Sequence, residues 1–189
     1  KADYISPIPD ASIPSALGYS KARNIPYIES LIRNRYVGRT FIIPDQKARE
    51  IAVKLKLNPV LPNIKGKRVI LFDDSIVRGT TSKRIINLLK DSGVKKVHMR
   101  VGCPPITSLC KLGIDMPTDK ELIANKNSID EIRKRIGADS LKYLSLNSLI
   151  KAIGMDKNKL CVGCLTGKYP IEILKYEQKL LPTFYKEEN

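Results

Sequence analysis

Two adjacent carboxylates, followed by a turn rich in hydroxyl groups, are the residues whose types and spacing best suit chemistry in this sequence. Asp73 and Asp74 open the run Asp-Asp-Ser-Ile-Val-Arg-Gly-Thr-Thr, which occupies positions 73–81. A continuous apolar run at 68–72 precedes them, and a helical pattern follows from Ser82. We therefore expect this loop at the carboxyl end of a buried strand, the edge at which parallel sheets bind ligands.

The two halves of the loop suit the two parts of a phosphorylated sugar. The N-terminus of the following helix offers unpaired N–H groups and a positive dipole end, which stabilise phosphate. Gly79 lets the backbone approach closely. Further hydroxyl donors are Ser75, Thr80 and Thr81. Asp73 and Asp74 repel phosphate but suit sugar hydroxyl groups or a divalent cation. The alternative is that both carboxylates only cap a turn.

The pattern around the loop alternates between strand and helix, which predicts an α/β fold with a mostly parallel sheet. Strands are expected at 2–6, 25–28, 68–72, 96–101 and 141–144. Helices are expected at 14–23, 45–57, 82–92 and 148–153, and a capping box at 128–131 opens one more. The polar stretch 33–39 is expected to be an exposed loop.

A chain of 189 residues suits one domain. We expect residues 1–112 to form the α/β core. The sequence changes character beyond Gly113, so residues 113–189 are expected to be a C-terminal part of the same domain, a small subdomain that closes over the core. No apolar run is long enough to span a membrane, which argues against a membrane protein.

The charge of the chain points to anionic partners without identifying them. The formal net charge is +15, which suits nucleic acid, a small polyphosphate or simply a Lys-rich solvated surface. Lys and Arg are spread along the chain and are not interleaved with aromatic residues. That distribution argues against nucleic acid as the partner.

Four cysteines are too few for a disulfide framework in a chain of this length, which favours a reducing, cytoplasmic setting. Cys103 and Cys110 lie close together in the sequence, and Cys161 and Cys164 form a C-x-x-C pair. This spacing suits metal ligands, redox groups or ordinary core residues.

Residues 69–81 resemble the phosphoribosyl pyrophosphate (PRPP) motif of the type I phosphoribosyltransferases, in the form found in the glutamine PRPP amidotransferase family. The resemblance extends over nearly the whole chain. Pro9-Asp10 with Ile13–Tyr19 is similar to the pyrophosphate loop of that family, and residues 34–42 are similar to its flexible lid. Further matching segments lie at 113–115, 121–124 and 136–139. The resemblance implies the type I phosphoribosyltransferase fold.

The resemblance also implies the site residues. PRPP would be bound by Asp10, Ser12, Asn34, Asp73, Asp74, Ser75, Ile76, Val77, Arg78, Gly79, Thr80 and Thr81. The catalytic residues would be Asp73 and Asp74 with Arg35, Tyr36 and Arg39 of the lid. Mg²⁺ would be held by Asp73 and Asp74. The family usually has a serine at the position of Ala11, so either Ser12 replaces that serine or the metal depends on the two carboxylates and the substrate.

The implied reaction is attack of ammonia on C1 of PRPP, which yields 5-phosphoribosylamine and pyrophosphate, the first step of de novo purine synthesis. The chain would use free ammonia, because the glutaminase domain that supplies ammonia from glutamine is absent from it and is the expected partner. The family further implies a homotetramer and a [4Fe–4S] cluster. Three ligands would be Cys110, Cys161 and Cys164, with the fourth outside this chain, whereas Cys103 would be a small buried residue.

Two other functions are compatible with a PRPP-binding loop. A PRPP-binding regulatory protein without catalysis, of the purine-repressor kind, is compatible with the positive charge, but it would not need the lid motif. A salvage enzyme would transfer the phosphoribosyl group to a purine base. The lid and the segment Cys-x-x-Cys-Leu-Thr-Gly-Lys-Tyr-Pro at 161–170 do not resemble those of salvage enzymes.

Overall fold

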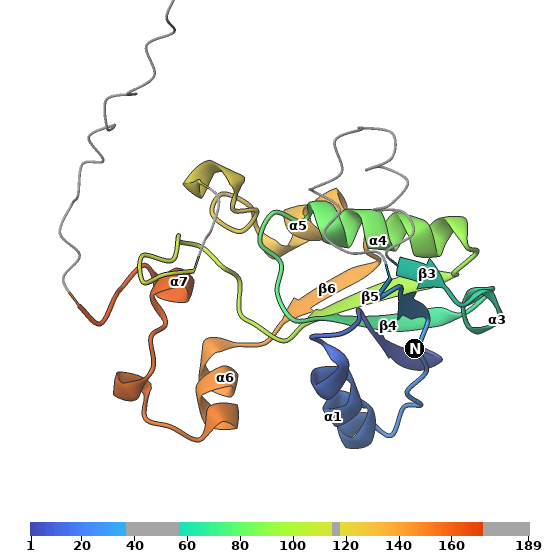
Figure 1. The fold of residues 1–189 in the computed structure, drawn as a ribbon, viewed down its shortest axis with the longest axis horizontal. Coiled ribbons are helices and arrows are strands. Elements are labelled where there is room, and N and C mark those ends of the chain that lie inside the picture. Colours follow the sequence, from blue (N-terminus) through green and yellow to red (C-terminus); the bar gives the residue numbers. More distant parts are fainter. Residues whose placement is uncertain (37–56, 115–117, 172–189) are drawn as a thin grey trace, which may run out of the picture.

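A four-stranded parallel sheet forms the centre of the molecule. The computed structural model describes residues 1–36, 57–114 and 118–171 (Figure 1). The strands stand in the order β1-β4-β5-β6, and every neighbouring pair is parallel. Their bounds are Tyr4–Pro7 for β1, Arg68–Asp73 for β4, Lys96–Val101 for β5 and Ser140–Tyr143 for β6. The predicted α/β fold with a mostly parallel sheet is confirmed.

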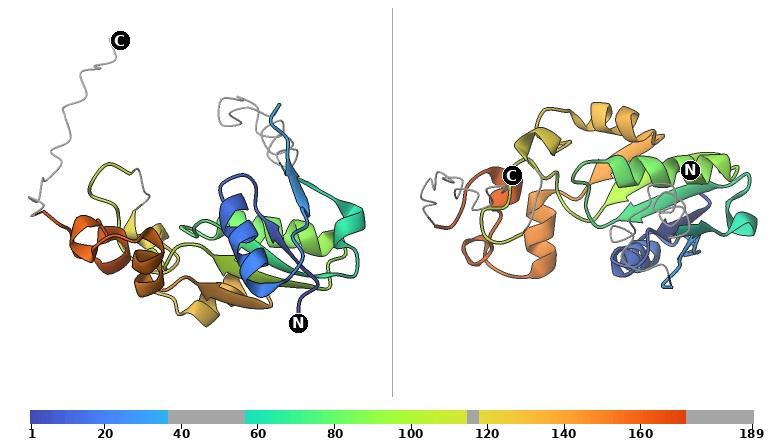
Figure 2. Two further views of the ribbon diagram at one scale, coloured as in Figure 1. Left: turned by 90° about the horizontal axis from the view of Figure 1, so that it is seen from below. Right: turned by 45° about the horizontal axis from the view of Figure 1, so that its top comes forward.

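Helices cover the sheet unequally on its two faces (Figures 1 and 2). Helix α4 (Thr80–Asp91) and helix α5 (Ile129–Ile136) lie together on one face, over β5 and β6. Helix α1 (Ile13–Arg23) lies on the opposite face, against β1 and β4. Because all four strands are parallel, their carboxyl ends lie at the same edge of the sheet.

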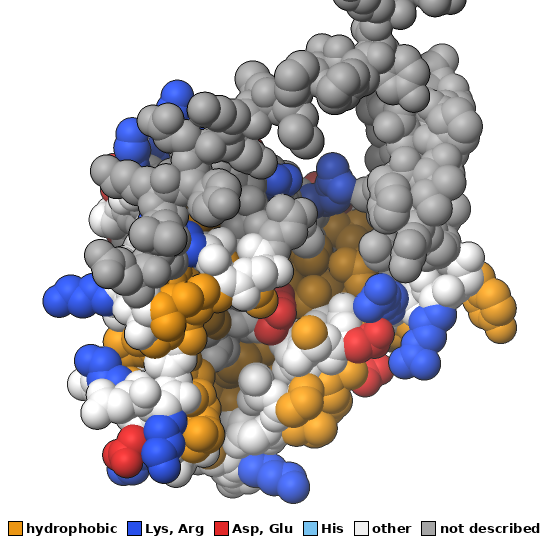
Figure 3. Space-filling view, turned by 60° about the vertical axis from the view of Figure 1, so that its left-hand side comes forward, with side chains coloured by type: hydrophobic (Ala, Val, Ile, Leu, Met, Phe, Trp, Pro, Cys, Tyr) orange, Lys and Arg blue, Asp and Glu red, His pale blue; other side chains and the backbone are white. Residues whose placement is uncertain are grey.

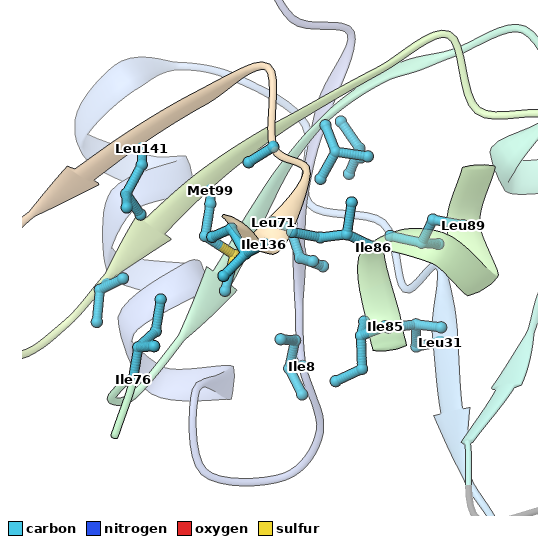
Figure 4. Close-up of a cluster of buried hydrophobic side chains, with 14 of the residues drawn as sticks. Ile8, Leu31, Leu71, Ile76, Ile85, Ile86, Leu89, Met99, Ile136 and Leu141 are labelled. Carbon is cyan, nitrogen blue, oxygen red and sulfur yellow. The ribbon is translucent and has the colours of Figure 1, made fainter. Parts of the chain in front are cut away.

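Strand β4 is buried on both faces, as its continuous apolar run predicts. Val69 and Leu71 pack into the larger core with α4 and α5, which Figure 4 shows around Leu71. Ile70 and Phe72 pack into a smaller core on the α1 side. Because side chains alternate along a strand, one strand anchors both halves of the core.

The predicted helices after β4 are confirmed with small shifts at their ends. Helix α4 begins two residues before Ser82 and buries Ile85 and Ile86, and Gly93 follows its end with a φ of 87°. Helix α5 begins at a complete capping box, in which Ser128 accepts a hydrogen bond from the Glu131 amide and the Glu131 side chain accepts one from Ser128.

We expected the region beyond Gly113 to be a small subdomain that closes over the core. Part of it instead belongs to the core itself. Strand β6 pairs with β5 inside the main sheet, and α5 packs on α4. The boundary drawn at residue 112 therefore divides one continuous core. Three short helices follow beyond the carboxyl edge of the sheet (Figure 1). They are α6 (Leu146–Ile153), η3 (Lys157–Lys159) and α7 (Gly163–Thr166).

The structure differs from the sequence-based expectation between residues 25 and 64. The strand predicted at 25–28 is a single bridge between Ile5 and Tyr27, because Pro26 has no N–H with which to extend a ladder. Strand β2 (Leu31–Arg33) pairs antiparallel with β3 (Leu57–Pro59), and neither was predicted. The helix predicted at 45–57 lies outside the described residues except for Leu57, which belongs to β3. Two short helices complete the fold, α3 (Leu61–Ile64) and η2 (Asp119–Glu121).

Within the described ranges, no helix combines the length and apolar character needed to cross a membrane.

Candidate active site

The loop between β4 and α4 surrounds a hollow of about 450 Å³ at the carboxyl edge of the sheet. Residues Asp73 to Ser82 line it. Seen from this end, the surface is hollowed and shows hydrophobic and acidic side chains together (Figure 3). No described side chain caps the N-terminus of α4 at Gly79, so its first N–H groups remain available to a ligand. These groups and the helix dipole favour an anion such as phosphate.

The two carboxylates of the loop occupy different environments. Asp73 is 8% exposed, and its oxygens accept hydrogen bonds from the Asp74 amide at 3.1 Å and from the Ser82 hydroxyl at 3.4 Å. Burial, with the neighbouring Asp74 carboxyl, raises the pKa of Asp73 to about 7. Asp74 is exposed. One carboxylate is thus fixed beneath the loop, while the other is open to a ligand. Ser82 lies just past the motif and was missed in the sequence.

These residues fit a divalent cation. Burial, and after it the neighbouring Asp74 carboxyl, raise the pKa of Asp73, and a bound cation would offset both costs of ionising it. Among the described residues, no group of three His, Cys, Asp or Glu side chains could hold a metal ion by itself. Mg²⁺ is usually held by one or two carboxylates together with substrate phosphates. Asp73 and Asp74 meet that requirement.

A close contact with a distant segment fixes the far end of the loop. Gly79 has a φ of 77°, and a Cβ atom built on it would lie 2.5 Å from Cδ1 of Ile123. The amide of Ile123 donates a hydrogen bond to the Val77 carbonyl at 2.9 Å, and Ile76 is buried in the core. The loop is therefore held from below by Ile76 and from the side by Ile123, whose part in the site the sequence did not indicate.

Arg78, which also lines the hollow, is paired with an acidic side chain from a distant segment. Its Nε atom lies 2.7 Å from Glu121 Oε2, in an ion pair across the surface. Glu121 belongs to the segment 121–124 that resembles the family, and its pairing with Arg78 is not evident from the sequence.

The predicted pyrophosphate loop lies beside the first loop, because β1 and β4 are neighbours and end at the same edge. The Ile8 amide donates to the Phe72 carbonyl at 2.7 Å. Ser12 is fully buried, and its hydroxyl donates to the carbonyls of Ile8 at 2.5 Å and Phe72 at 2.9 Å. The suggestion that Ser12 replaces the missing serine as a magnesium ligand is therefore wrong. Its hydroxyl joins the two strand ends, and Ala11 offers no side-chain oxygen.

The start of the predicted lid reaches the same edge. Asp10 forms ion pairs with Arg33 at 3.2 Å and with Arg35 at 3.9 Å. Tyr36 is fully exposed, and its amide donates to the Asn34 side chain. Asp10 and Arg35 are thus brought together, whereas a packing role for Tyr36 stays a prediction. Arg39 lies outside the described residues.

The segments that carry the three candidate cluster ligands are joined to each other. The amides of Thr107 and Ser108 both donate to the Cys164 carbonyl at 3.0 Å, and the Tyr169 hydroxyl donates to the Leu109 carbonyl. Gly163 lies beneath the Tyr169 ring, where a Cβ atom would collide with it. These contacts bring the Cys-x-x-Cys segment against the stretch that ends at Cys110.

All four cysteines are thiols rather than disulfides. Burial and the nearby Cys110 and Cys161 raise the pKa of the Cys164 thiol, which places the three candidate ligands in one neighbourhood. Burial is also the main cause that raises the pKa of Cys103 to about 11. Thiolates are the usual ligands of iron–sulfur clusters, but among the described residues these thiols are not grouped at metal-binding distances.

Comparison with known proteins gives a consistent result. The amidophosphoribosyltransferase of Methanothermobacter thermautotrophicus is 56% identical over 180 residues, which cover 93% of this chain and 38% of the relative. The amidophosphoribosyltransferase of Methanocaldococcus jannaschii is 59% identical over 172 residues, which cover 91% of this chain and 36% of the relative. The solved glutamine PRPP amidotransferase from Bacillus subtilis, complexed with ADP and GMP, matches with a TM-score of 0.83 at 50% identity and covers 93% of this chain and 40% of that chain. No protein-family model matches the chain.

The chain spans just under two fifths of the length of these curated relatives. The identity is high over nearly all of the chain. The chain also shares the fold of the solved structure, which is the type I phosphoribosyltransferase arrangement of sheet and helices. Sequence and fold together place the chain in the amidophosphoribosyltransferase family.

Proposed function

We propose that this chain carries the phosphoribosyl-transfer site of an amidophosphoribosyltransferase. It would bind PRPP with Mg²⁺ and convert PRPP and ammonia to 5-phosphoribosylamine and pyrophosphate. The observation that supports this most directly is the arrangement of the loop, in which a buried Asp73 and an exposed Asp74 stand directly before the open N-terminus of α4. That arrangement offers carboxylates to ribose hydroxyl groups and N–H groups to a phosphate.

The chemical step requires little proton transfer from the protein. A bond forms between the ammonia nitrogen and C1 of the ribose, the bond from C1 to the pyrophosphate oxygen breaks, and one proton leaves the nitrogen for pyrophosphate or solvent. Positive charge develops on the ribose, and the carboxylates of Asp73 and Asp74 stabilise it. Ammonia is already a nucleophile, so no general base is needed. This agrees with the position of His98, the only histidine of the chain, which is hydrogen-bonded to Ser140 at 3.0 Å.

Bound Mg²⁺ would stabilise the negative charge of the departing pyrophosphate. Arg35 of the lid would add a second positive charge, and in the ligand-free arrangement Asp10 keeps it at the same edge of the sheet. Closing the lid would also exclude water, which competes with ammonia for C1.

The alternative, a PRPP-binding regulator without catalysis, is less well supported. The curated relatives described above are named as enzymes, amidophosphoribosyltransferases, and no feature of the described residues favours a regulator over them. We further propose a glutaminase domain as the source of ammonia and a homo-oligomeric state. We also propose a [4Fe–4S] cluster on Cys110, Cys161 and Cys164, which the contacts between their segments support.

The test is an assay of pyrophosphate release by the purified chain with PRPP and Mg²⁺. Ammonium at raised pH should give pyrophosphate and phosphoribosylamine, whereas glutamine should give neither. Release with adenine but not with ammonium would assign the chain to salvage instead. PRPP binding without release under any of these conditions would favour the regulator.

A further inference from the structure

One side of α4 faces the core, and Ser82 is the first residue on that side. The buried residues of this helix are Ser82, Ile85, Ile86 and Leu89, at the spacing of a single helix face (Figure 4). Three of them are apolar and pack into the larger core, whereas Ser82 is polar and only 2% exposed. Alanine would favour the helix more and would bring no hydroxyl group out of water. A hydroxyl group at this position therefore requires a specific partner.

That partner is the carboxylate of Asp73. Across the part of the chain that the structure describes, the Ser82 hydroxyl has one hydrogen-bond partner, Oδ2 of Asp73 at 3.4 Å. The other oxygen of the carboxylate, Oδ1, accepts a hydrogen bond from the Asp74 amide at 3.1 Å. Because each oxygen has a donor, the plane of the carboxylate is fixed, and so are the directions of its remaining lone pairs. The Asp74 donor belongs to the backbone, so Ser82 supplies the side-chain half of this support.

Ser82 also connects the two halves of the candidate site. It is the third residue of α4, so its amide belongs to the first turn, where N–H groups are open to a phosphate. Its hydroxyl contacts the carboxylate at the end of β4, and both residues line the hollow. Loss of this one hydroxyl would therefore affect the acidic half of the site without removing any N–H group from the phosphate half.

We propose that Ser82 is a positioning residue for phosphoribosyl transfer, because its hydroxyl fixes the direction in which the Asp73 carboxylate faces the ribose. This role rests on the function proposed above. Ser82 acts through Asp73 and does not itself touch the reacting atoms. Asp73 stabilises positive charge that develops on the ribose only during the reaction. A misdirected carboxylate therefore slows the chemical step more than it weakens the binding of PRPP.

Steady-state kinetics of the chain with PRPP, Mg²⁺ and ammonium separate this role from a purely structural one. Ser82→Ala should lower kcat by about 5- to 10-fold, the effect of one hydrogen bond, while KM for PRPP changes by less than about twofold. If the hydroxyl only stabilised the start of α4, its loss would instead raise KM with kcat unchanged, because the phosphate contacts lie there. That result would overturn the proposal.

Ser92→Ala is the matched control for these kinetics. Ser92 follows the last residue of the same helix, and its hydroxyl donates to the Leu88 carbonyl at 2.7 Å. The control thus removes a serine hydroxyl and its hydrogen bond at the end of α4 that lies away from the loop. Both kcat and KM of this variant should match those of the unmodified protein.

A double-mutant cycle shows whether Ser82 acts through Asp73. In an Asp73→Ala background there is no carboxylate to direct, so Ser82→Ala should change kcat by less than about twofold. A further loss of about 5- to 10-fold in that background would show an independent role and overturn the proposal. A kcat of Ser82→Ala equal to that of the unmodified protein would do the same. Failure of the proposed function is distinguishable, because the unmodified chain would then release no pyrophosphate with ammonium.

Urea unfolding of the same variants gives a readout that does not depend on turnover. If the hydroxyl and the carboxylate interact in the ligand-free fold, the losses of unfolding free energy in the two single variants should not add up to the loss in the double variant. Additive losses would show that the two groups do not interact, and the proposal would then be wrong whatever the kinetics.

Discussion

Gly79 lies directly against Ile123, so that a Cβ atom on the glycine would come within 2.5 Å of Cδ1 of the isoleucine. The same glycine has a φ of 77°, which only glycine adopts without strain. Two independent constraints therefore meet at the last residue before α4. One is a property of the turn, and the other comes from a segment more than forty positions away in the sequence.

Gly79→Ala should lower the free energy of unfolding more than the same change at a glycine that has a positive φ but no close neighbour. Gly154 has a φ of 72° but no atom within 4 Å of its would-be Cβ, and it serves as the control. Gly154→Ala should cost about 1–2 kcal/mol of unfolding free energy from backbone strain. Gly79→Ala should cost about 1–3 kcal/mol more from the collision. Denaturant unfolding measures both, and equal losses would remove Ile123 from the explanation.

The two carboxylates should be required for transfer. Asp73→Asn or Asp74→Asn should lower kcat/KM for PRPP by about 100- to 1,000-fold, because loss of one electrostatic contact to the transition state costs about 2.7–4 kcal/mol. Asp91→Asn, an exposed carboxylate at the other end of α4, is the matched control and should retain activity. Turnover close to that of the unmodified protein in both loop variants would place the site elsewhere.

The stability of the ligand-free protein should depend on the titration of Asp73. Its folded pKa of about 7 lies above the unfolded value, so the folded state holds this proton more tightly. The resulting stability is fully present below the unfolded pKa and is lost as the pH rises through about 7. Asp73→Asn should remove this loss between pH 4 and pH 8 in urea unfolding.

The pKa of Asp3 is shifted in the opposite direction to that of Asp73, so Asp3 serves as a comparison. Its hydrogen bonds with Arg68 lower the pKa of its carboxyl, so the stability it contributes is present above the unfolded pKa and is lost as the pH falls. Asp3→Asn should therefore lower the free energy of unfolding at neutral pH and remove the decline in that free energy on the acid side. An unchanged pH profile for Asp73→Asn would contradict the assigned burial of that carboxyl.

The lid should become protected when substrate binds. Arg35 is exposed and paired loosely with Asp10 without ligand, so trypsin should cut after it readily. PRPP with Mg²⁺ should slow that cut, because the lid closes over the site. Cleavage after Lys157, which lies in η3 away from the loop, serves as the internal reference. The same rate of cleavage after Arg35 with and without ligand would count against closure.

The cluster should depend on three of the four cysteines. Cys161→Ser in the full-length protein, prepared without oxygen, should lose iron and sulfide together with its brown colour. Cys103→Ser should keep them, since the family resemblance gives this residue no ligand role; Cys103 is half-buried rather than fully buried as expected. Zinc in place of iron would leave a metal site but not a cluster. A metal-free protein would overturn the proposal, whatever its activity.

The sequence predicts most accurately those elements whose signals are local. The strand expected at 68–72 is observed at Arg68–Asp73, the helix expected from Ser82 begins at Thr80, and the strand expected at 96–101 has those bounds. The capping box at Ser128 likewise needs only its own four residues. By contrast, β2 and β3 are three residues each and pair across an intervening stretch, so no short window identifies them.

The sequence predicts which residue types belong to the candidate site, but it does not predict the directions or partners of their side chains. The paired carboxylates and the glycine follow from residue types, whereas the direction of the Ser12 hydroxyl depends on two carbonyls, one of them 60 residues away. The same holds for Glu121, which pairs with Arg78 only because η2 lies beside the loop. Contacts between segments distant in the sequence determine which polar groups remain available to a ligand.

The order of the strands also has a consequence for how the chain folds. Strand β4 pairs with β5 across 28 positions, from Arg68 to Lys96, whereas β1 reaches β4 across 65 positions, from Tyr4 to Val69. Closing the shorter loop costs less chain entropy, so β4, α4 and β5 should form early and β1 should join late. The substrate loop therefore lies inside the unit that forms first. The phosphate-binding half of this loop should therefore form before β1, the strand that leads into the neighbouring predicted pyrophosphate loop, has joined the sheet.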